Sequence, residues 1–197
     1  KALQESEGDF DSAAKLLRER GMAVAAKRAS KAANQGRIAA VESDDDATKA
    51  MVEVNCETDF VARNADFQAF VDEVAQKALT TDEDLGELMK DTLMDKIAAI
   101  GENIKIRRNV RYALSGTGKV ASYIHMGGKV GVLLEVGCEK DDTVGNPAFD
   151  ELVKDLTLHV AAAAPRYLTS DEVPESEVAA EREIFAKQVE DKPANII

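Results

Sequence analysis

The chain has 197 residues, of which 45% are hydrophobic and 31% charged, a composition typical of a folded protein rather than a disordered one. Its net charge of −12 argues against a nucleic-acid-binding protein, because neutralising phosphates requires clustered lysine and arginine. Two cysteines, no apolar run long enough to span a bilayer and no recognisable secretory signal lead us to expect a cytoplasmic protein outside the membrane.

Residues 1–35 are expected to form helices only. Gly8 predicts a turn and Gly21 a helix end, and between them one apolar helix face is predicted from Phe10, Ala13, Ala14, Leu16 and Leu17. The basic run from Lys15 to Lys31 fits a solvated face or a contact with an acidic protein, and RNA binding is the alternative. The chain opens inside a helical pattern and closes on "KPANII" without a cap, so we expect a fragment or a partly ordered chain.

The pattern then changes to the alternation of strands. Two strands are predicted on either side of residues 44–48, followed by a helix over 64–79 with one apolar face made by Phe67, Phe70, Val71, Val74 and Ala78. A single amphipathic helix is predicted over 86–100, with an apolar face made by Leu88, Leu93, Ile97 and Ile100. Alternation over 103–114 predicts a strand in which one side carries Ile104, Ile106, Val110, Tyr112 and Leu114.

A second hairpin is predicted over 118–138, then a helix over 146–164 that Pro165 ends, a polar link and a last helix over 176–190. This part repeats the first at a constant offset of 82 residues, at the positions Gly36, Ala39, Glu53, Val54, Cys56, Glu57, Asp59, Asn64, Phe67 and Val71. Such self-similarity indicates one duplicated strand–strand–helix unit. We therefore predict an α+β fold of two related halves, each an antiparallel sheet with helices on one face.

The two copies differ in the loop between strand and helix. In "NCETDFVARN" the first copy has Phe60 where the second has Asp142. If a phenylalanine were needed to close this corner, the second copy should need one too. We therefore predict that Phe60 contacts something outside the chain, and packing beneath its own helix is the alternative.

Residues for covalent chemistry are sparse. The only histidines are His125 and His159, and neither has the spacing to pair with a cysteine as a nucleophile. No zinc, redox, phosphate-loop or serine-hydrolase motif is present, and "SGTGK" at 115–119 fits a hairpin turn better than a phosphate loop. Cys56 and Cys138 are expected to be buried strand thiols, with a disulfide between them as the alternative. The residues predict a binding protein without metal or cofactor, and a Cys–His enzyme is a distant rival.

Four motifs carry a specific resemblance: "VNCETDFVARN", "AAIGENIKIRR", "GKVASYIH" and "LHVAAAAPRYL". In content and order they resemble the bacterial elongation factor Ts family over nearly the whole chain. The resemblance implies a partial ubiquitin-associated-like helical module over 1–35, a core subdomain N over 36–115 and a core subdomain C over 116–197. It also implies that the chain stops before the family's coiled coil and C-terminal module.

The same resemblance implies a function in translation elongation, guanine-nucleotide exchange on the GTPase elongation factor Tu, with no direct nucleic-acid contact. It implies that the loop of Thr58, Asp59, Phe60 and Val61 enters the GTPase near its Mg²⁺ and nucleotide. Ile100 and Gly101 would meet a helix of the GTPase domain, although a helix C-cap also explains them. His125 would face another domain of the partner, although an exposed strand-end histidine is the plainer reading. The alternative function is a passive interaction module without exchange activity.

Overall fold

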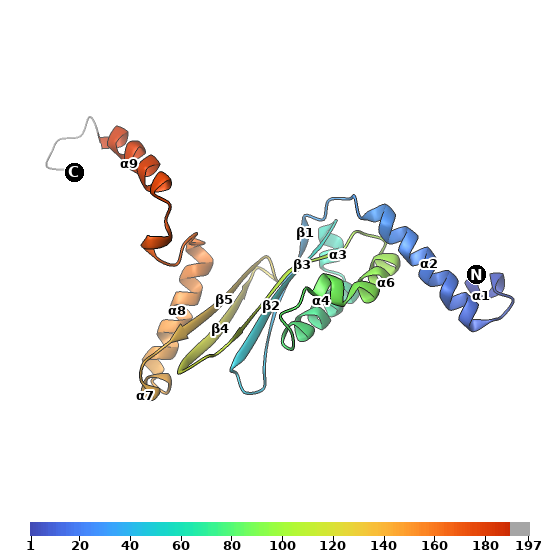
Figure 1. Cartoon of the computed structure of the whole chain (residues 1–197), viewed down its shortest axis with the longest axis horizontal. Coiled ribbons are helices and arrows are strands. Elements are labelled where there is room, and N and C mark those ends of the chain that lie inside the picture. Colours follow the sequence, from blue (N-terminus) through green and yellow to red (C-terminus); the bar gives the residue numbers. More distant parts are fainter. Residues whose placement is uncertain (190–197) are drawn as a thin grey trace. The chain divides into compact units, whose positions relative to one another are not determined.

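The structure is a computed structural model that describes residues 1–189, and the predicted chain end "KPANII" lies outside the described residues. The chain divides into a unit of residues Lys1–Ala162, which contains both sheets, and a second unit that begins at Ala163 (Figure 1). No helix among residues 1–189 is long and apolar enough to cross a membrane. The three predicted domain boundaries stay a prediction.

The described residues form helices and antiparallel strands, which confirms the predicted α+β class. In chain order the elements are α1 (Ala2–Glu5), α2 (Phe10–Arg28), β1 (Gln35–Glu42), β2 (Thr48–Cys56), α3 (Asp59–Ala62), α4 (Ala65–Ala78), α5 (Leu85–Leu88), α6 (Lys90–Ile100), β3 (Lys105–Ala113), β4 (Gly118–His125), β5 (Val130–Gly137), α7 (Asp141–Val144), α8 (Pro147–Ala163), η1 (Ser170–Glu172) and α9 (Glu175–Val189).

The main core lies between α4 and a three-stranded sheet of order β1-β2-β3. Helix α4 presents Phe67, Phe70 and Val71, each fully buried, to this sheet, as its apolar spacing predicted. The alternate residues Val52 and Val54 of β2 meet them from the sheet. Full burial of such a side chain is worth about 1.5–3 kcal/mol, so this layer is the main source of stability for the first unit.

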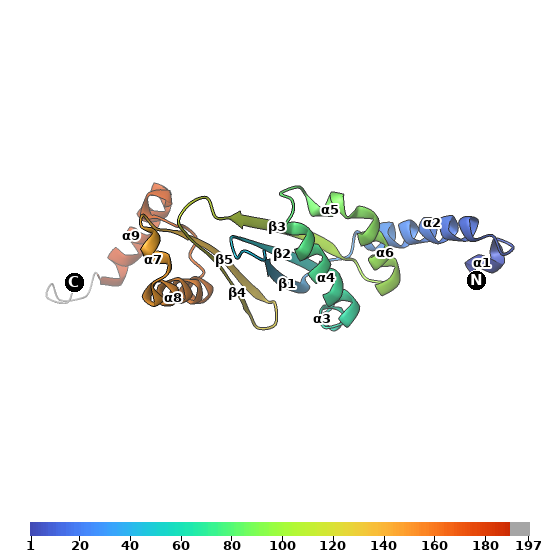
Figure 2. The same cartoon turned by 90° about the horizontal axis from the view of Figure 1, so that it is seen from below.

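The N-terminal segment differs from its prediction. Gly8 makes the expected turn and Asp9 caps α2, but the helix continues through Gly21 to Arg28. Gly21 is buried where α2 packs on α6 (Figure 2), and a Cβ built there would lie 3.4 Å from the Cβ of Ala98. This glycine therefore lies inside α2, at its contact with α6, rather than ending the helix. Phe10 and Leu17 of the predicted apolar face are exposed, because the contact uses the small residues of α2.

The single helix predicted over 86–100 is two helices, α5 and α6. Asp84 caps α5 by accepting hydrogen bonds from the backbone N–H groups of Gly86 and Glu87, and Met89 leaves the helical conformation between α5 and α6. The break turns the chain, so Leu85 is fully buried and Leu88, which the prediction placed on the apolar face, is exposed.

A β-bulge in β3 overturns another prediction. Val54 pairs with Ile106 but Glu53 pairs with Arg108, so Arg107 is an extra residue. An extra residue reverses the side to which every later side chain points. Ile104 and Ile106 therefore face the core, whereas Val110 and Tyr112 face the opposite side of the sheet, 40% and 38% exposed.

The second hairpin repeats the first at the predicted offset. Gly36 pairs with Asn55 in β1–β2, and Gly118 pairs with Gly137 in β4–β5. A Cβ at either of these two first glycines would lie 2.2 Å from a carbonyl oxygen of the partner strand, so both copies require glycine. The short turns α3 and α7 and the starts of helices α4 and α8 also keep the offset of 82 residues. Duplication of a strand–strand–helix unit is confirmed.

The copies differ at their edges. The second sheet has two strands where the first has three, so β5, unlike β2, has a strand on one side only in the described structure. Both cysteines, at equivalent strand ends, are free thiols rather than a disulfide. Cys56 is buried as predicted, but Cys138 is only half-buried, since its sheet is covered less completely.

The second unit, in its described part, is a link followed by a helix, as predicted. Helix α8 ends at Ala163, before Pro165. The link is held by Glu177 of α9, whose carboxylate accepts hydrogen bonds from Arg166 at 2.9 Å and from the hydroxyl of Tyr167 at 2.8 Å. This bond raises the pKa of the Tyr167 hydroxyl, because it favours the protonated form.

Candidate functional site

Helix α3 is a single turn, of which one side packs on the core and the other faces solvent. Thr58 begins it, and its Oγ1 accepts a hydrogen bond from the Val61 N–H at 3.3 Å. Ala62 is buried and Val61 is half-buried against the core of α4 and the sheet. Phe60, between these anchors, is 82% exposed. This exposure excludes the alternative that Phe60 packs beneath its own helix, and its contact with something outside the chain stays a prediction.

Asp59 also points outward from this turn. Its carboxylate accepts a hydrogen bond from Arg63 at 2.9 Å, in an ion pair that is largely exposed. Exposed pairs of this kind contribute only about 0–1 kcal/mol. Arg63 is therefore easily displaced, and Asp59 and Phe60 together form a small acidic and aromatic projection.

The turn is tied to the loop after α6 by one carboxylate. Glu102 Oε2 accepts hydrogen bonds from the backbone N–H groups of Glu57 at 3.1 Å and Thr58 at 3.0 Å. Its other oxygen, Oε1, accepts from the Thr58 hydroxyl at 2.7 Å. The acceptor is a charged carboxylate, so these bonds are stronger than neutral ones. The start of α3 is thereby fixed to the chain just beyond Gly101.

A second carboxylate, that of Glu57, extends this network to α2. Glu57 Oε1 accepts from the Asn103 N–H at 2.6 Å, and Arg28 approaches the same carboxylate at 3.4 Å. The buried amide of Asn103 donates to the Lys31 carbonyl at 2.6 Å. Three segments that are distant in sequence therefore meet at the base of the Phe60 turn.

Ile100 and Gly101 lie beside this network. Gly101 ends α6 with a φ of +82°, a conformation that glycine adopts without strain, and its N–H bonds to the Ile97 carbonyl at 2.8 Å. Ile100 is half-buried against the core. The C-cap reading of Gly101 is thus correct, and the structure brings this loop together with Thr58 through Glu102.

His125, on the second hairpin, lies near the end of the first sheet that carries α3. It is exposed at the end of β4, where its Nδ1 is 2.8 Å from the Tyr123 hydroxyl. The turn that follows is fastened to β1, because Ile38 donates its N–H to the Gly128 carbonyl at 2.7 Å. Lys129 of this turn also donates to Gln35 at 3.0 Å, and both views show the turn beside the end of the sheet that carries α3 (Figures 1 and 2).

Cys56 ends β2 directly behind the turn. Its thiol donates to the Thr58 carbonyl at 3.2 Å. Burial raises the pKa of this thiol to about 11, and the negative charge of Glu102 adds to the shift. A thiol that stays protonated at neutral pH is a poor nucleophile, which argues against the Cys–His enzyme.

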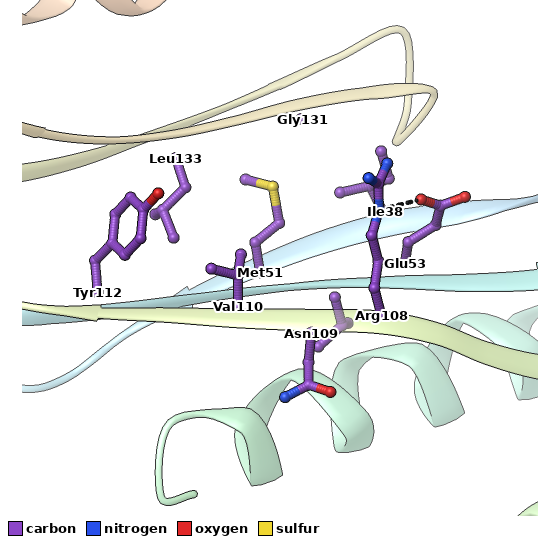
Figure 3. Close-up of a pocket in the computed structure, with 10 residues that line it drawn as sticks. Ile38, Met51, Glu53, Arg108, Asn109, Val110, Tyr112, Gly131 and Leu133 are labelled. Carbon is purple, nitrogen blue, oxygen red and sulfur yellow. Dashed lines mark hydrogen bonds and ion pairs between the residues drawn. The ribbon is translucent and has the colours of Figure 1, made fainter. Parts of the chain in front are cut away.

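A separate cleft of about 300 Å³ lies between the β4–β5 hairpin and the face of the first sheet opposite α4 (Figure 3). It is lined mainly by Ile38, Met51, Val110, Tyr112 and Leu133, with the ion pair of Arg108 and Glu53 at one side. None of the predicted site residues lines it. Elsewhere in residues 1–189, no three or more His, Cys, Asp and Glu side chains gather in a way that could hold a metal ion.

Half of the six cations in the basic run from Lys15 to Lys31 are paired within the chain. Arg18 pairs with Asp91 at 2.7 Å, Arg20 with Glu5, and Arg28 with Glu57. These pairs reduce the positive charge that α2 presents to solvent. They weigh against the RNA-binding alternative, since that reading needs the cations available for phosphates.

The sequence analysis assigned no role to Glu102 or Asn103, and it used Glu57 only as a position of the repeat. The available signal was their place beside a helix-ending glycine, in "IGEN". In a chain with 37 acidic residues, a glutamate at such a position cannot be told from a solvated one without coordinates. Only the fold reveals that its carboxylate meets the N–H groups of a loop 44 residues earlier.

Comparison with known proteins finds relatives of this chain by sequence. The family model described as "Elongation factor TS" matches residues 57–197. The protein named elongation factor Ts in Nitratiruptor sp. is 42% identical over 209 residues, covering 100% of this chain and 68% of the relative. Those of Clostridioides difficile and of Clostridium botulinum (strain Eklund 17B) are 43% and 41% identical, covering 100% of this chain and 67% and 68% of the relatives.

Proposed function

Because this chain belongs to the elongation factor Ts family, we propose that it binds the GTPase elongation factor Tu and accelerates release of its GDP during translation elongation. Family membership carries the general role of a nucleotide exchange factor, which catalyses no covalent reaction. The finer proposal is that the Asp59–Phe60 projection enters the partner near its Mg²⁺ and nucleotide.

The exposure of Phe60 is the observation that carries this proposal. A phenylalanine that is 82% exposed contributes almost nothing to its own core, while its neighbours Val61 and Ala62 anchor the turn. Burial of such a side chain in a partner is worth about 1.5–3 kcal/mol. That free energy is available to favour a GTPase conformation in which Mg²⁺ and phosphate contacts are disturbed, and those contacts are what hold the nucleotide.

Three regions of the chain contribute to the proposed interface. Thr58 to Val61 supply the projection, Ile100 and Gly101 a second contact beside it, and His125 a third from the turn after β4. Support for this set comes from the Glu102 network, which joins the first two, and from Lys129, which fastens the third to β1. Binding free energies on one partner are linked. If this protein weakens the binding of GDP to elongation factor Tu by some factor, GDP weakens the binding of this protein to elongation factor Tu by the same factor.

The decisive experiment follows release of fluorescent GDP from purified elongation factor Tu after addition of excess unlabelled nucleotide. We expect this protein to raise the release rate by at least about tenfold, equivalent to about 1.4 kcal/mol of transition-state stabilisation. Binding of the two proteins should be measured in parallel. A complex that forms without faster release would establish the passive interaction module instead.

A further inference from the structure

We propose that Glu102 is a positioning residue, which holds the Phe60 turn in its binding conformation before the partner arrives. The inference rests on the proposed function, because it takes Phe60 as the side chain that meets the GTPase. Glu102 is half-buried on the loop after α6, and both of its carboxylate oxygens are directed at the start of α3.

The hydrogen bonds of Thr58 show how Glu102 can fix the orientation of the turn. The Thr58 hydroxyl donates a hydrogen bond to Glu102 and at the same time accepts one from the N–H of Val61, in the first turn of α3. A hydroxyl has one hydrogen and two lone pairs. When its hydrogen points toward the Glu102 carboxylate, a lone pair is left to face the N–H of Val61. Glu102 therefore sets the orientation of the cap that defines the direction of Phe60.

The second copy of the repeat serves as an internal control for this interpretation. Its turn α7 keeps the backbone offset, but Lys140 stands at the cap position without a side-chain capping bond, and Asp142 replaces Phe60. Among the described residues, the side-chain bonds of this turn stay within the second copy: the carboxylate of Asp141 accepts from the Thr117 hydroxyl, and the Cys138 thiol lies against the Lys140 carbonyl. The corner thus folds without a carboxylate from another segment of the chain that accepts the N–H groups at its cap. Such a carboxylate occurs in the copy that carries the exposed phenylalanine, so closing the corner does not account for it.

Holding the Phe60 turn in its binding conformation before the partner arrives has a specific consequence for affinity. If the binding conformation is populated only in part, the apparent dissociation constant rises by the inverse of that population. Removing the carboxylate leaves the N–H groups of Glu57 and Thr58 without their acceptor and frees the cap. The bound turn, once formed, is unchanged. Loss of Glu102 should therefore weaken the apparent affinity and leave the exchange rate at saturation nearly intact.

The first test needs no partner. The chain contains no tryptophan, so Phe60→Trp introduces a single tryptophan at the tip of the turn, which can be excited selectively over the three tyrosines. In this background we expect Glu102→Ala to lower the residual fluorescence anisotropy of residue 60. Glu102→Gln should preserve most of it, because the amide oxygen can still accept the two backbone N–H bonds. Glu73→Ala, at an exposed position on α4, is the matched control. Anisotropy unchanged by Glu102→Ala would overturn the proposal.

The second test separates positioning from exchange itself. With native Phe60, Glu102→Ala should raise the half-saturating concentration for GDP release about tenfold, with the saturated rate within about twofold. A saturated rate that falls as far as it does for Phe60→Ala would contradict a positioning role. If Glu102→Ala fails to fold, Glu102→Asp, whose shorter side chain withdraws the carboxylate from the Thr58 hydroxyl, takes its place. Should the unaltered protein fail to release GDP, the proposed function is lost, while the anisotropy still decides the role of Glu102.

Discussion

Phe60 and Val61 are neighbours in one helical turn but have opposite surroundings. Val61 packs against the core, and Phe60 projects into solvent from a backbone held by the Thr58 cap and by Glu102. Exposing a large apolar side chain gives no folding benefit, whereas a rigid backbone reduces the entropy lost when that side chain is buried in a partner. The two features together are those of an anchor residue for binding.

Substitution of Phe60 should separate folding from exchange. Phe60→Ala should change the free energy of unfolding by less than about 0.5 kcal/mol, because exposed truncations have small effects. It should slow stimulated GDP release by at least about tenfold. Thermal or urea unfolding and the fluorescent GDP assay measure the two quantities.

Phe67→Ala is the matched control, since Phe67 is fully buried on α4. It should cost about 3–5 kcal/mol of stability through the cavity that it leaves. Equal destabilisation by the two substitutions would make Phe60 a core residue. A Phe60→Ala protein with normal stability and normal GDP release would contradict the proposed insertion.

At the scale of helices and strands, the sequence predicts the features that follow a regular apolar spacing. Both hairpins and the buried face of α4 follow from regular apolar spacing, and the corner that carries Phe60 follows from the departure of one repeat copy from the other. The bulge at Arg107 and the break at Met89 are irregularities of a single residue, which no period records. Glu102 could not be predicted either, because its role depends on a long-range contact.

The packing of α2 on α6 provides the prediction at this scale. Gly21 lies inside α2, where glycine is about 1 kcal/mol less favourable than alanine, and a Cβ there would make ordinary contact with Ala98 at 3.4 Å. Gly21→Ala should therefore raise stability by about 0.5–1 kcal/mol. Gly21→Leu should lower it, since a larger side chain has to separate the helices. Thermal unfolding followed by circular dichroism compares the two variants. If Gly21→Ala lowers stability, α2 and α6 leave no room for the added methyl group.

The first unit combines a densely packed sheet with a lightly packed N-terminal segment. Strand β2 is buried along most of its length between β1 and β3, whereas α2 buries only Ala13 and Gly21. Arg28 and Lys31, at the end of that segment, are nevertheless joined to the network around Glu57 and Asn103. Local stability should therefore increase along α2 toward the core.

Native-state hydrogen exchange measures that gradient. We expect amides in residues 10–20 to exchange faster than those of Met51 to Asn55, because few buried contacts oppose local opening there. Amides near Arg28 should have intermediate protection. Protection in residues 10–20 as strong as that in β2 would show that the N-terminal segment unfolds only with the core.

The shared register of the two hairpins also bears on how such a chain diverges over generations. A duplicated unit that needs glycine at position 36 or 118, but tolerates either Phe60 or Asp142 at its corner, divides its positions into constrained and permissive ones. Substitutions at the permissive corner cost little stability, so selection for folding does not remove them. One corner can then acquire a binding role while the equivalent corner keeps only its structural role, so a duplicated fold offers more than one position at which recognition can arise.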